Sequence, residues 1–201
     1  MPEIVVATRN AHKLAEIGEI LAPVLPGVQL LPDTAPAPAE TGTSFIENAL
    51  IKARTAASHT GKLALADDSG ISVEVMGSSP GIFSARWAGP DRSDRDNLEL
   101  LLWQMRDVPE NARAASFVCA AVAVLPLPGG GFAERTALAH WHGTLLAAPQ
   151  GEQGFGYDPI FQPAGHTCSA AELTAVEKNA LSHRFRAFSE LAPQLPELLA
   201  S

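Results

Sequence analysis

The sequence predicts an α/β protein built around a mixed β-sheet, and three patterns lead to this fold class. Helix-like and strand-like segments mix irregularly along the 201 residues. Capping boxes at Ser44–Glu47 and Thr174–Glu177 mark the starts of two helices. A long apolar segment, Arg113–Leu125, is followed by a glycine-rich turn and a second strand-like segment, which indicates a hairpin.

The first half of the chain is predicted to contain short strands and two helices. Leu14, Ile17 and Leu21 share one helical face, and prolines follow them. Phe45, with alanines at helical spacing behind it, forms a second apolar stripe that ends near Gly61. We therefore expect strands at Glu3–Thr8, Val28–Leu31, Leu63–Ala66 and Ile71–Val75, and helices at His12–Leu21 and from Ser44 to about Ser58.

The second half is predicted to hold the hairpin between two further helices. The expected elements are a helix at Ser93–Met105, strands at Arg113–Leu125 and Phe132–His142, a loop at Gly151–Gly156, and a helix from Thr174 to about Leu191. The sequence has no internal repeat and no linker long enough to separate domains. We therefore expect residues 1–201 to form a single domain.

Composition and charge exclude several classes of protein. With 46% hydrophobic and 18% charged residues the chain is globular. Its net charge of −8 argues against a nucleic-acid partner. The longest apolar run, Ala114–Leu125, is too short to cross a membrane, and no secretory signal is visible. We expect a soluble cytoplasmic protein without a membrane partner, in which Cys119 and Cys168 are reduced thiols.

Two polar segments of the first half are candidates for binding phosphate or metal. Thr8–Lys13 follows a strand and starts a helix, where exposed N–H groups and Lys13 suit a phosphate, although an ordinary capped turn has the same pattern. Glu40 precedes the second helix, on which Ser44, Asn48 and Lys52 form one polar stripe. This stripe fits either a solvated face or a site where Glu40 binds a metal and Lys52 reaches a phosphate.

Asp67 and Asp68 stand at the predicted end of an apolar strand, before Ser69 and Gly70. Two adjacent carboxylates repel each other, and a hard cation such as Mg²⁺ would offset that cost; a simple Asp turn is the alternative. Because adjacent strand residues point to opposite faces, only one of them should face the site. We favour Asp68, and we expect Asp67 to hold backbone N–H groups.

Aromatic and imidazole groups complete the candidates. Glycines on both sides of Phe155 would let the backbone approach a planar ligand on which that ring stacks, although a buried Phe in an ordinary loop also fits. His140 and His142 are spaced to share a strand face, but without a third ligand a surface strand is favoured over a zinc site.

Taken together, five segments resemble the inosine/xanthosine triphosphate pyrophosphatase family nearly from end to end. They are ATRNAHK (7–13), ETGTSFIENALIKA (40–53), ADDSGISVEVMGSSPGIFSARWAG (66–89), GFGYDPIF (154–161) and AELTAVEKNALSHR (171–184). Any one could arise by chance, but five in the family's order make a specific signal.

The resemblance implies Mg²⁺-dependent hydrolysis of ITP, dITP and XTP to the monophosphate and pyrophosphate, which removes deaminated purines from the nucleotide pool. It also implies an elongated mixed sheet flanked by helices, two lobes around a central nucleotide cleft, and a homodimer. By analogy Asp68, Lys13 and Lys52 are catalytic, and Glu40 and Asp68 bind the metal. The implied substrate-binding residues are Thr8, Arg9, Asn10, Ala11, His12, Lys13, Ser69, Phe155, Gly156, Tyr157, Asp158, Lys178, His183 and Arg184.

Two positions depart from the family pattern, and three functions stay open. The family often has Gly where His12 stands, and commonly Gly where Phe185 follows the His-Arg pair, so the shape of the base pocket is in question.

For base selectivity, we hypothesise that groups near Ser182, His183 and Arg184 donate N–H bonds to the 6-oxo group of hypoxanthine or xanthine. The alternatives are a different metal-dependent phosphohydrolase and a non-catalytic nucleotide-binding protein.

Overall fold

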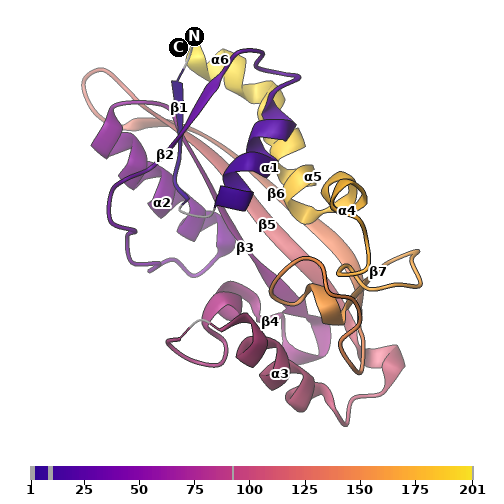
Figure 1. Cartoon of the computed structure of the whole chain (residues 1–201). Coiled ribbons are helices and arrows are strands. Elements are labelled where there is room, and N and C mark those ends of the chain that lie inside the picture. Colours follow the sequence, from indigo (N-terminus) through magenta and orange to yellow (C-terminus); the bar gives the residue numbers. More distant parts are fainter. Residues whose placement is uncertain (1–2, 9–10, 92, 201) are drawn as a thin grey trace. The chain divides into compact units, whose positions relative to one another are not determined.

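A computed structural model describes residues 3–8, 11–91 and 93–200, and its described part contains a seven-stranded sheet (Figure 1). The strand order is β2-β1-β3-β5-β6-β7, with β4 paired to β3. Strand β1 is parallel to β2 and β3, whereas β4 and β7 are antiparallel to β3 and β6, so the prediction of a mixed sheet is confirmed. The strands are β1 (Glu3–Val6), β2 (Gln29–Pro32), β3 (Ala64–Val73), β4 (Ser79–Pro80), β5 (Ala114–Pro126), β6 (Phe132–Leu145) and β7 (Phe161–Pro163).

The helices begin where the sequence places their caps. Ser44 accepts a hydrogen bond from the Glu47 N–H at the start of α2, and Gly61 ends that helix in the left-handed conformation that glycine favours. Ser93 caps α3 in the same way. The α-helices are α1 (Ala11–Leu21), α2 (Phe45–Thr60), α3 (Asp94–Met105), α4 (Ala175–Leu181), α5 (His183–Leu191) and α6 (Leu195–Leu199). Among the described residues, none of these helices is long and apolar enough to cross a membrane.

Two predictions of secondary structure are wrong. The strand expected to end at Asp67 continues as β3 to Val73, because the Ile71 N–H donates to Ser84 Oγ and Gly70 lets that segment approach closely. A Cβ at Gly70 would lie 2.4 Å from the Gly81 carbonyl oxygen. The single helix expected from Thr174 to Leu191 is two helices, since Ser182 is extended (ψ 154°) and ends α4.

The chain divides into two compact units. Unit 1 comprises residues 1–68, 119–139 and 184–201, and its sheet carries side chains in strict alternation. Odd-numbered residues of β3 and β5, such as Leu65 and Ala121, pack with α1, α5 and α6, whereas even-numbered ones, such as Ala66 and Ala120, pack with α2. The period of two therefore sends neighbouring residues of one strand to two separate cores.

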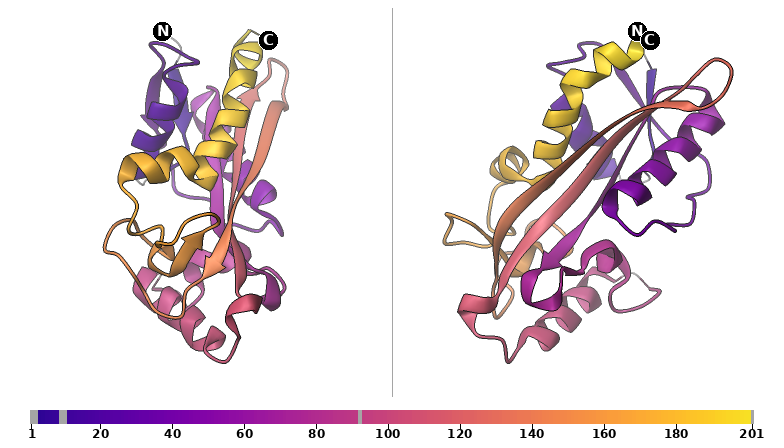
Figure 2. Two further views of the ribbon diagram at one scale, coloured as in Figure 1. Left: turned by 90° about the vertical axis from the view of Figure 1, so that its right-hand side faces the viewer. Right: turned by 180° about the vertical axis from the view of Figure 1, so that it is seen from behind.

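Unit 2 comprises residues 69–118 and 140–183 and has an aromatic core of its own. The rings of Phe117 and Phe161 meet edge to face at 4.7 Å between centroids, and Trp141 contacts both. Helix α3 adds Leu101 and Met105 to this cluster. The long β5–β6 hairpin (Figure 2), whose strands supply residues to both units, confirms the predicted pair of strands.

Candidate active site

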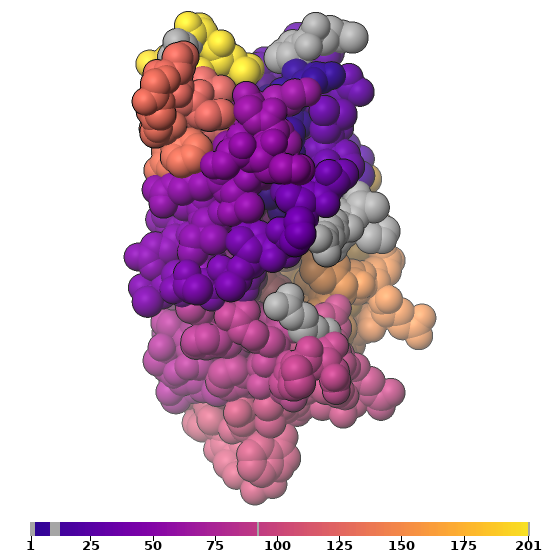
Figure 3. Space-filling model, turned by 90° about the vertical axis from the view of Figure 1, so that its left-hand side faces the viewer, coloured from indigo at the N-terminus to yellow at the C-terminus, as the bar shows by residue number. Residues whose placement is uncertain are grey.

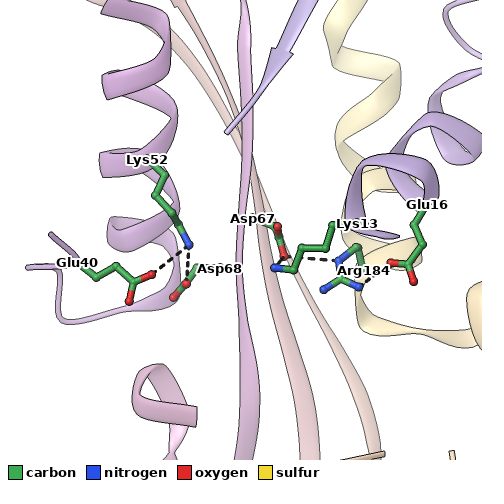
Figure 4. Close-up of polar contacts among 7 residues, drawn as sticks. All are labelled: Lys13, Glu16, Glu40, Lys52, Asp67, Asp68 and Arg184. Atoms are coloured by element: carbon green, nitrogen blue, oxygen red, sulfur yellow. Dashed lines mark hydrogen bonds and ion pairs between the residues drawn. The ribbon is translucent and has the colours of Figure 1, made fainter. Parts of the chain in front are cut away.

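Asp67 and Asp68 point to opposite faces of β3 (Figure 4). The alternation of the strand dictates this, because Asp67 continues the odd-numbered series with Leu65 and Asp68 the even-numbered series with Ala66. Asp67 therefore meets α1 and α5, and Asp68 meets α2. One dipeptide thus supplies a carboxylate to each of two charged clusters in unit 1.

The first cluster, on the α2 face, consists of Asp68, Lys52 and Glu40. Lys52 Nζ lies 2.8 Å from Asp68 Oδ1 and 3.5 Å from Glu40 Oε1. Burial raises the pKa of Asp68, and Glu40 and Asp67 raise it further, although Lys52 opposes them. For Lys52, burial lowers the pKa, but the surrounding carboxylates outweigh that effect and raise it. Asp68 is therefore a stronger base than an ordinary aspartate, beside a lysine that keeps its charge.

The second cluster, on the opposite face, consists of Asp67, Lys13, Arg184 and Glu16. Asp67 Oδ2 accepts a hydrogen bond from Lys13 Nζ at 2.8 Å and lies 3.5 Å from Arg184 Nε, while Arg184 Nη1 donates to Glu16 Oε2 at 2.7 Å. Burial alone would raise the pKa of Asp67, but the nearby cations outweigh it and hold this pKa far below its ordinary value. Asp67 is therefore a fixed anion.

The two clusters differ in charge. With every group ionised, Asp68, Glu40 and Lys52 sum to −1, because two carboxylates face one ammonium. Asp67, Glu16, Lys13 and Arg184 sum to zero. The α2 face thus has an excess of carboxylate oxygen, the ligand that hard cations such as Mg²⁺ prefer, whereas the other face is neutral.

A cavity of about 70 Å³ adjoins the first cluster. Lys52 lines it together with Thr8, which follows β1. Its remaining walls come from the end of β1 and the segment after β2, namely Ala7, Asp33, Ala35, Ala37 and Pro38. The cavity therefore places a hydroxyl and an ammonium, both able to bind phosphate oxygen, around one space.

Unit 2 holds an aromatic group anchored by polar contacts. Phe155 is 46% exposed, and Lys178 Nζ lies 4.9 Å from the centroid of its ring. Asp158 pairs with Lys178 at 2.5 Å and accepts the Phe155 N–H at 2.8 Å. The Gly156 N–H donates to Asp94, and the Tyr157 hydroxyl donates to the Ser84 carbonyl. These contacts fix the loop with the Phe155 ring partly open to solvent.

The structure brings some of the predicted site residues together and separates others. Lys52, Glu40 and Asp68 meet, as do Phe155, Asp158 and Lys178, whereas Lys13 lies on the opposite face of β3 from Lys52. His183 is buried with its ring stacked on Phe117, and Ser69 lies within β3. Arg9 and Asn10 lie outside the described residues, and of Ala11 and His12 only the backbone, in α1, is described.

Two residues of these clusters, Glu16 and Asp94, were not predicted from the sequence. Glu16 is three residues after Lys13, and this helical spacing places both side chains on one face of α1. The spacing was therefore a signal in the sequence that could have identified Glu16. The contacts of Asp67 with Lys13 and Arg184 were not foreseen, and Asp94 as an anchor of Gly156 had no sequence signal. His140 and His142 do share a face of β6, with ring centroids 5.6 Å apart, and both are exposed, as expected of a surface strand.

The described residues thus combine a mixed α/β sheet with a net-negative lysine–carboxylate cluster beside a small, mostly apolar cavity, and such a cluster is able to hold a hard cation and a phosphate. A family model described as the Ham1 family matches residues 4–194, and the chain belongs to that family.

Curated relatives match over the whole length. A dITP/XTP pyrophosphatase of Streptomyces avermitilis is 50% identical, covering 99% of this chain and 100% of its own. One from Leifsonia xyli is 48% identical, with 98% of each chain covered. Among solved structures, a HAM1 protein from Coxiella burnetii superposes with a TM-score of 0.89 at 40% identity, covering 98% of this chain and 100% of that one. The predicted family is confirmed.

Proposed function

We propose that the protein is a nucleoside-triphosphate pyrophosphatase that hydrolyses dITP, ITP and XTP to the monophosphate and pyrophosphate. The observation that carries this proposal is the net-negative cluster of Asp68, Lys52 and Glu40 in a chain about 50% identical to dITP/XTP pyrophosphatases. Its role in the cell would be the removal of deaminated purines from the nucleotide pool.

The residues of this cluster fit a divalent cation, for which we propose Mg²⁺. Asp68 and Glu40 would bind it, since their two carboxylates share a single lysine and retain an excess negative charge. A triphosphate is itself polyanionic and would be repelled by a net-negative site. When bound, Mg²⁺ would neutralise charge on the phosphate oxygens and favour departure of pyrophosphate.

In the proposed reaction, Asp68 accepts a proton from the water that attacks the α-phosphorus, and the bond from that phosphorus to the pyrophosphate oxygen breaks. In the metal-free protein burial raises the pKa of Asp68, which makes its carboxylate a better proton acceptor, whereas a bound cation would lower this pKa. Lys52 would exchange its contact with Asp68 for a phosphate oxygen, and Thr8 would bind the same phosphates because it lines the same cavity. Lys13, which is catalytic by the family resemblance, pairs with Asp67 on the opposite face of β3 from Lys52, and its contact with the triphosphate stays a proposal.

We propose that the loop of Phe155 binds the purine. Lys178 covers part of the ring by a cation–π contact, and the exposed part is free to stack on a base. Asp158 keeps Lys178 and the Phe155 backbone in place. The remaining predicted binding residues, including Ser69, Gly156, Tyr157, His183 and Arg184, stay proposals; Arg184 would act through Asp67 and Glu16, which occupy its guanidinium.

Replacing Phe155 with Ala should raise KM for dITP about tenfold or more and change kcat less, because base–aromatic stacking contributes about 1–3 kcal/mol. Steady-state kinetics with dITP measures this. Trp103→Ala is the matched control, since Trp103 is an aromatic of the same unit with 61% exposure and should leave KM unchanged. An unchanged KM in Phe155→Ala would remove this ring from base binding.

Identification of the products tests the reaction class. With dITP and Mg²⁺, we expect equal amounts of dIMP and pyrophosphate, and no turnover once EDTA removes the metal. Release of orthophosphate would indicate a nucleotidase, the alternative phosphohydrolase. Binding of dITP without turnover would indicate a nucleotide-binding protein instead of an enzyme.

The family resemblance also leads us to propose that residues 1–201 act as one catalytic domain, in a cytoplasmic homodimer. The family model supports the first point, since it spans segments of both units in a single match. Light scattering coupled to size exclusion would give twice the 21.1 kDa chain mass for a dimer. A mass of one chain would contradict it.

A further inference from the structure

Asn48, in the first turns of α2, holds the backbone of the segment that carries Glu40. Its side chain is fully buried, and its Oδ1 accepts the Gly42 N–H at 2.9 Å. Gly42 is two residues after Glu40, whose carboxylate lies beside Lys52 one turn further along the helix. The surface of this segment and of α2 is visible in Figure 3 (purple). The side-chain amide of Asn48 thus connects helix α2 to the segment that carries Glu40, a proposed metal ligand.

The segment before α2 is held at further points. Thr43 donates from its N–H and its hydroxyl to Glu47 Oε2, at 2.6 and 2.9 Å, while the Glu47 N–H donates to Ser44 Oγ at 3.2 Å. These bonds lie on the exposed side, whereas the bond of Asn48 is the inner one. Gly42 also packs without space for a side chain, since a Cβ would lie 2.7 Å from Asn48 Oδ1 and 2.6 Å from Glu47 Cβ.

Packing alone does not explain an asparagine at position 48. Its Nδ2 has no hydrogen-bond partner among the described residues, and a buried amide donor without an acceptor is unfavourable compared with an apolar side chain of the same shape. The hydrogen bond from the Gly42 N–H to Asn48 Oδ1 is the contribution of the amide that offsets the cost of its unpaired Nδ2. Gly42 is two residues from Glu40, so a displacement of the backbone at Gly42 by even about 1 Å would move the carboxylate of this proposed metal ligand.

Asn97 provides an internal counterpart. It is also the fourth residue of a helix capped by serine, and it is also buried, and its Oδ1 accepts the Ala88 N–H at 2.7 Å. The two asparagines thus accept the same kind of backbone hydrogen bond, but Asn97 lies in unit 2 and holds Ala88, not the segment that carries Glu40. Their replacement should therefore cost similar stability, and only one of them should affect the metal.

We propose that Asn48 is a positioning residue, which sets the carboxylate of Glu40 for Mg²⁺ by fixing the backbone at Gly42. This inference rests on the proposed function of Glu40 as a metal ligand. Residues that orient metal ligands typically change affinity by about 10–100-fold when they are removed. Asn48→Leu should therefore weaken Mg²⁺ binding about tenfold or more.

The experiment compares Asn48→Leu with Asn97→Leu in the full-length protein. Calorimetric titration with Mg²⁺ in the absence of nucleotide gives the affinity, and hydrogen exchange reports on the Gly42 N–H. We expect Asn48→Leu to lose protection at Gly42 and to bind Mg²⁺ about tenfold more weakly, and Asn97→Leu to retain both values. If Asn48→Leu fails to fold, Gly42→Ala is the second variant. Gly42 is partly exposed, and the added methyl group would push the same segment away from Glu47 and Asn48, so Mg²⁺ binding should weaken in the same way.

Two outcomes would overturn the proposal. One is a folded Asn48→Leu or Gly42→Ala protein with the Mg²⁺ affinity of the wild type, and the other is an equal loss of affinity in Asn97→Leu. Hydrolysis of dITP by the wild-type protein is measured first. Failure of the proposed function would appear there, whereas failure of the Asn48 proposal would appear as unchanged Mg²⁺ affinity in an active enzyme.

Discussion

Asp68→Asn is expected to lower kcat for dITP by at least about 100-fold while the protein still binds the nucleotide. General-base catalysis contributes about 10²–10⁴-fold, and the amide can neither accept the proton of the attacking water nor supply the same charge to a metal. Burial and two carboxylate neighbours raise the pKa of Asp68, so its loss removes a carboxylate that is a stronger base than an ordinary aspartate. Single-turnover hydrolysis and equilibrium binding of dITP measure the two effects separately.

Glu134→Gln is the control for this substitution, because Glu134 forms an exposed ion pair with Arg54 and should leave kcat unchanged. Turnover of Asp68→Asn within a few-fold of the wild type would exclude Asp68 as the base. Lost binding together with lost turnover would instead assign Asp68 to substrate or metal binding.

Asp67→Asn, one residue away, is expected to lower the free energy of unfolding by about 3 kcal/mol, because it removes the carboxylate that pairs with the partly buried Lys13 and one of the two carboxylates that face the buried Arg184. Asp67 has a lowered pKa in the folded state, so its ionised form stabilises the fold at neutral pH. Asp68 has a raised pKa, so its ionised form is less favourable in the folded than in the unfolded chain, and Asp68→Asn should destabilise the protein less than Asp67→Asn does, although it also removes a partner of Lys52. Urea unfolding at pH 7 measures both variants.

The contrast between neighbouring, chemically identical substitutions is the test. A midpoint for Asp67→Asn close to that of the wild type would show that Lys13 and Arg184 find other partners. Glu134→Gln again serves as the control, since an exposed pair contributes about 1 kcal/mol or less. A destabilisation of Asp68→Asn as large as that of Asp67→Asn would contradict the opposite directions of their pKa shifts.

Local patterns were sufficient to predict most of the fold. The caps of α2 and α4 and the β5–β6 hairpin are encoded by neighbouring residues, and they lie where the sequence placed them. The opposite orientation of Asp67 and Asp68 also follows from a local rule, strand alternation, whereas the helix that each of them meets does not.

Long-range contacts were not predictable in this way. Arg184 and Glu16 are 168 residues apart, and no spacing rule connects them. The separation of Lys13 from Lys52 depends on which helix covers which face of β3, and that order comes from tertiary packing. The break at Ser182 was missed because the residues around it have an apolar period compatible with one continuous helix.

The proposed hydrolysis of non-canonical purine nucleotides is tested most directly by pyrophosphate release in the presence of Mg²⁺. The substrates to compare at equal concentrations are dITP, ITP, XTP, ATP and GTP. Adenine carries a 6-amino donor where hypoxanthine and xanthine carry a 6-oxo acceptor, and guanine adds a 2-amino group to hypoxanthine. A site that donates to the 6-oxo group should discriminate strongly against ATP. We expect fast release from dITP, ITP and XTP and little from ATP or GTP. Equal rates on all five nucleotides, or no pyrophosphate from any of them, would contradict the proposed function.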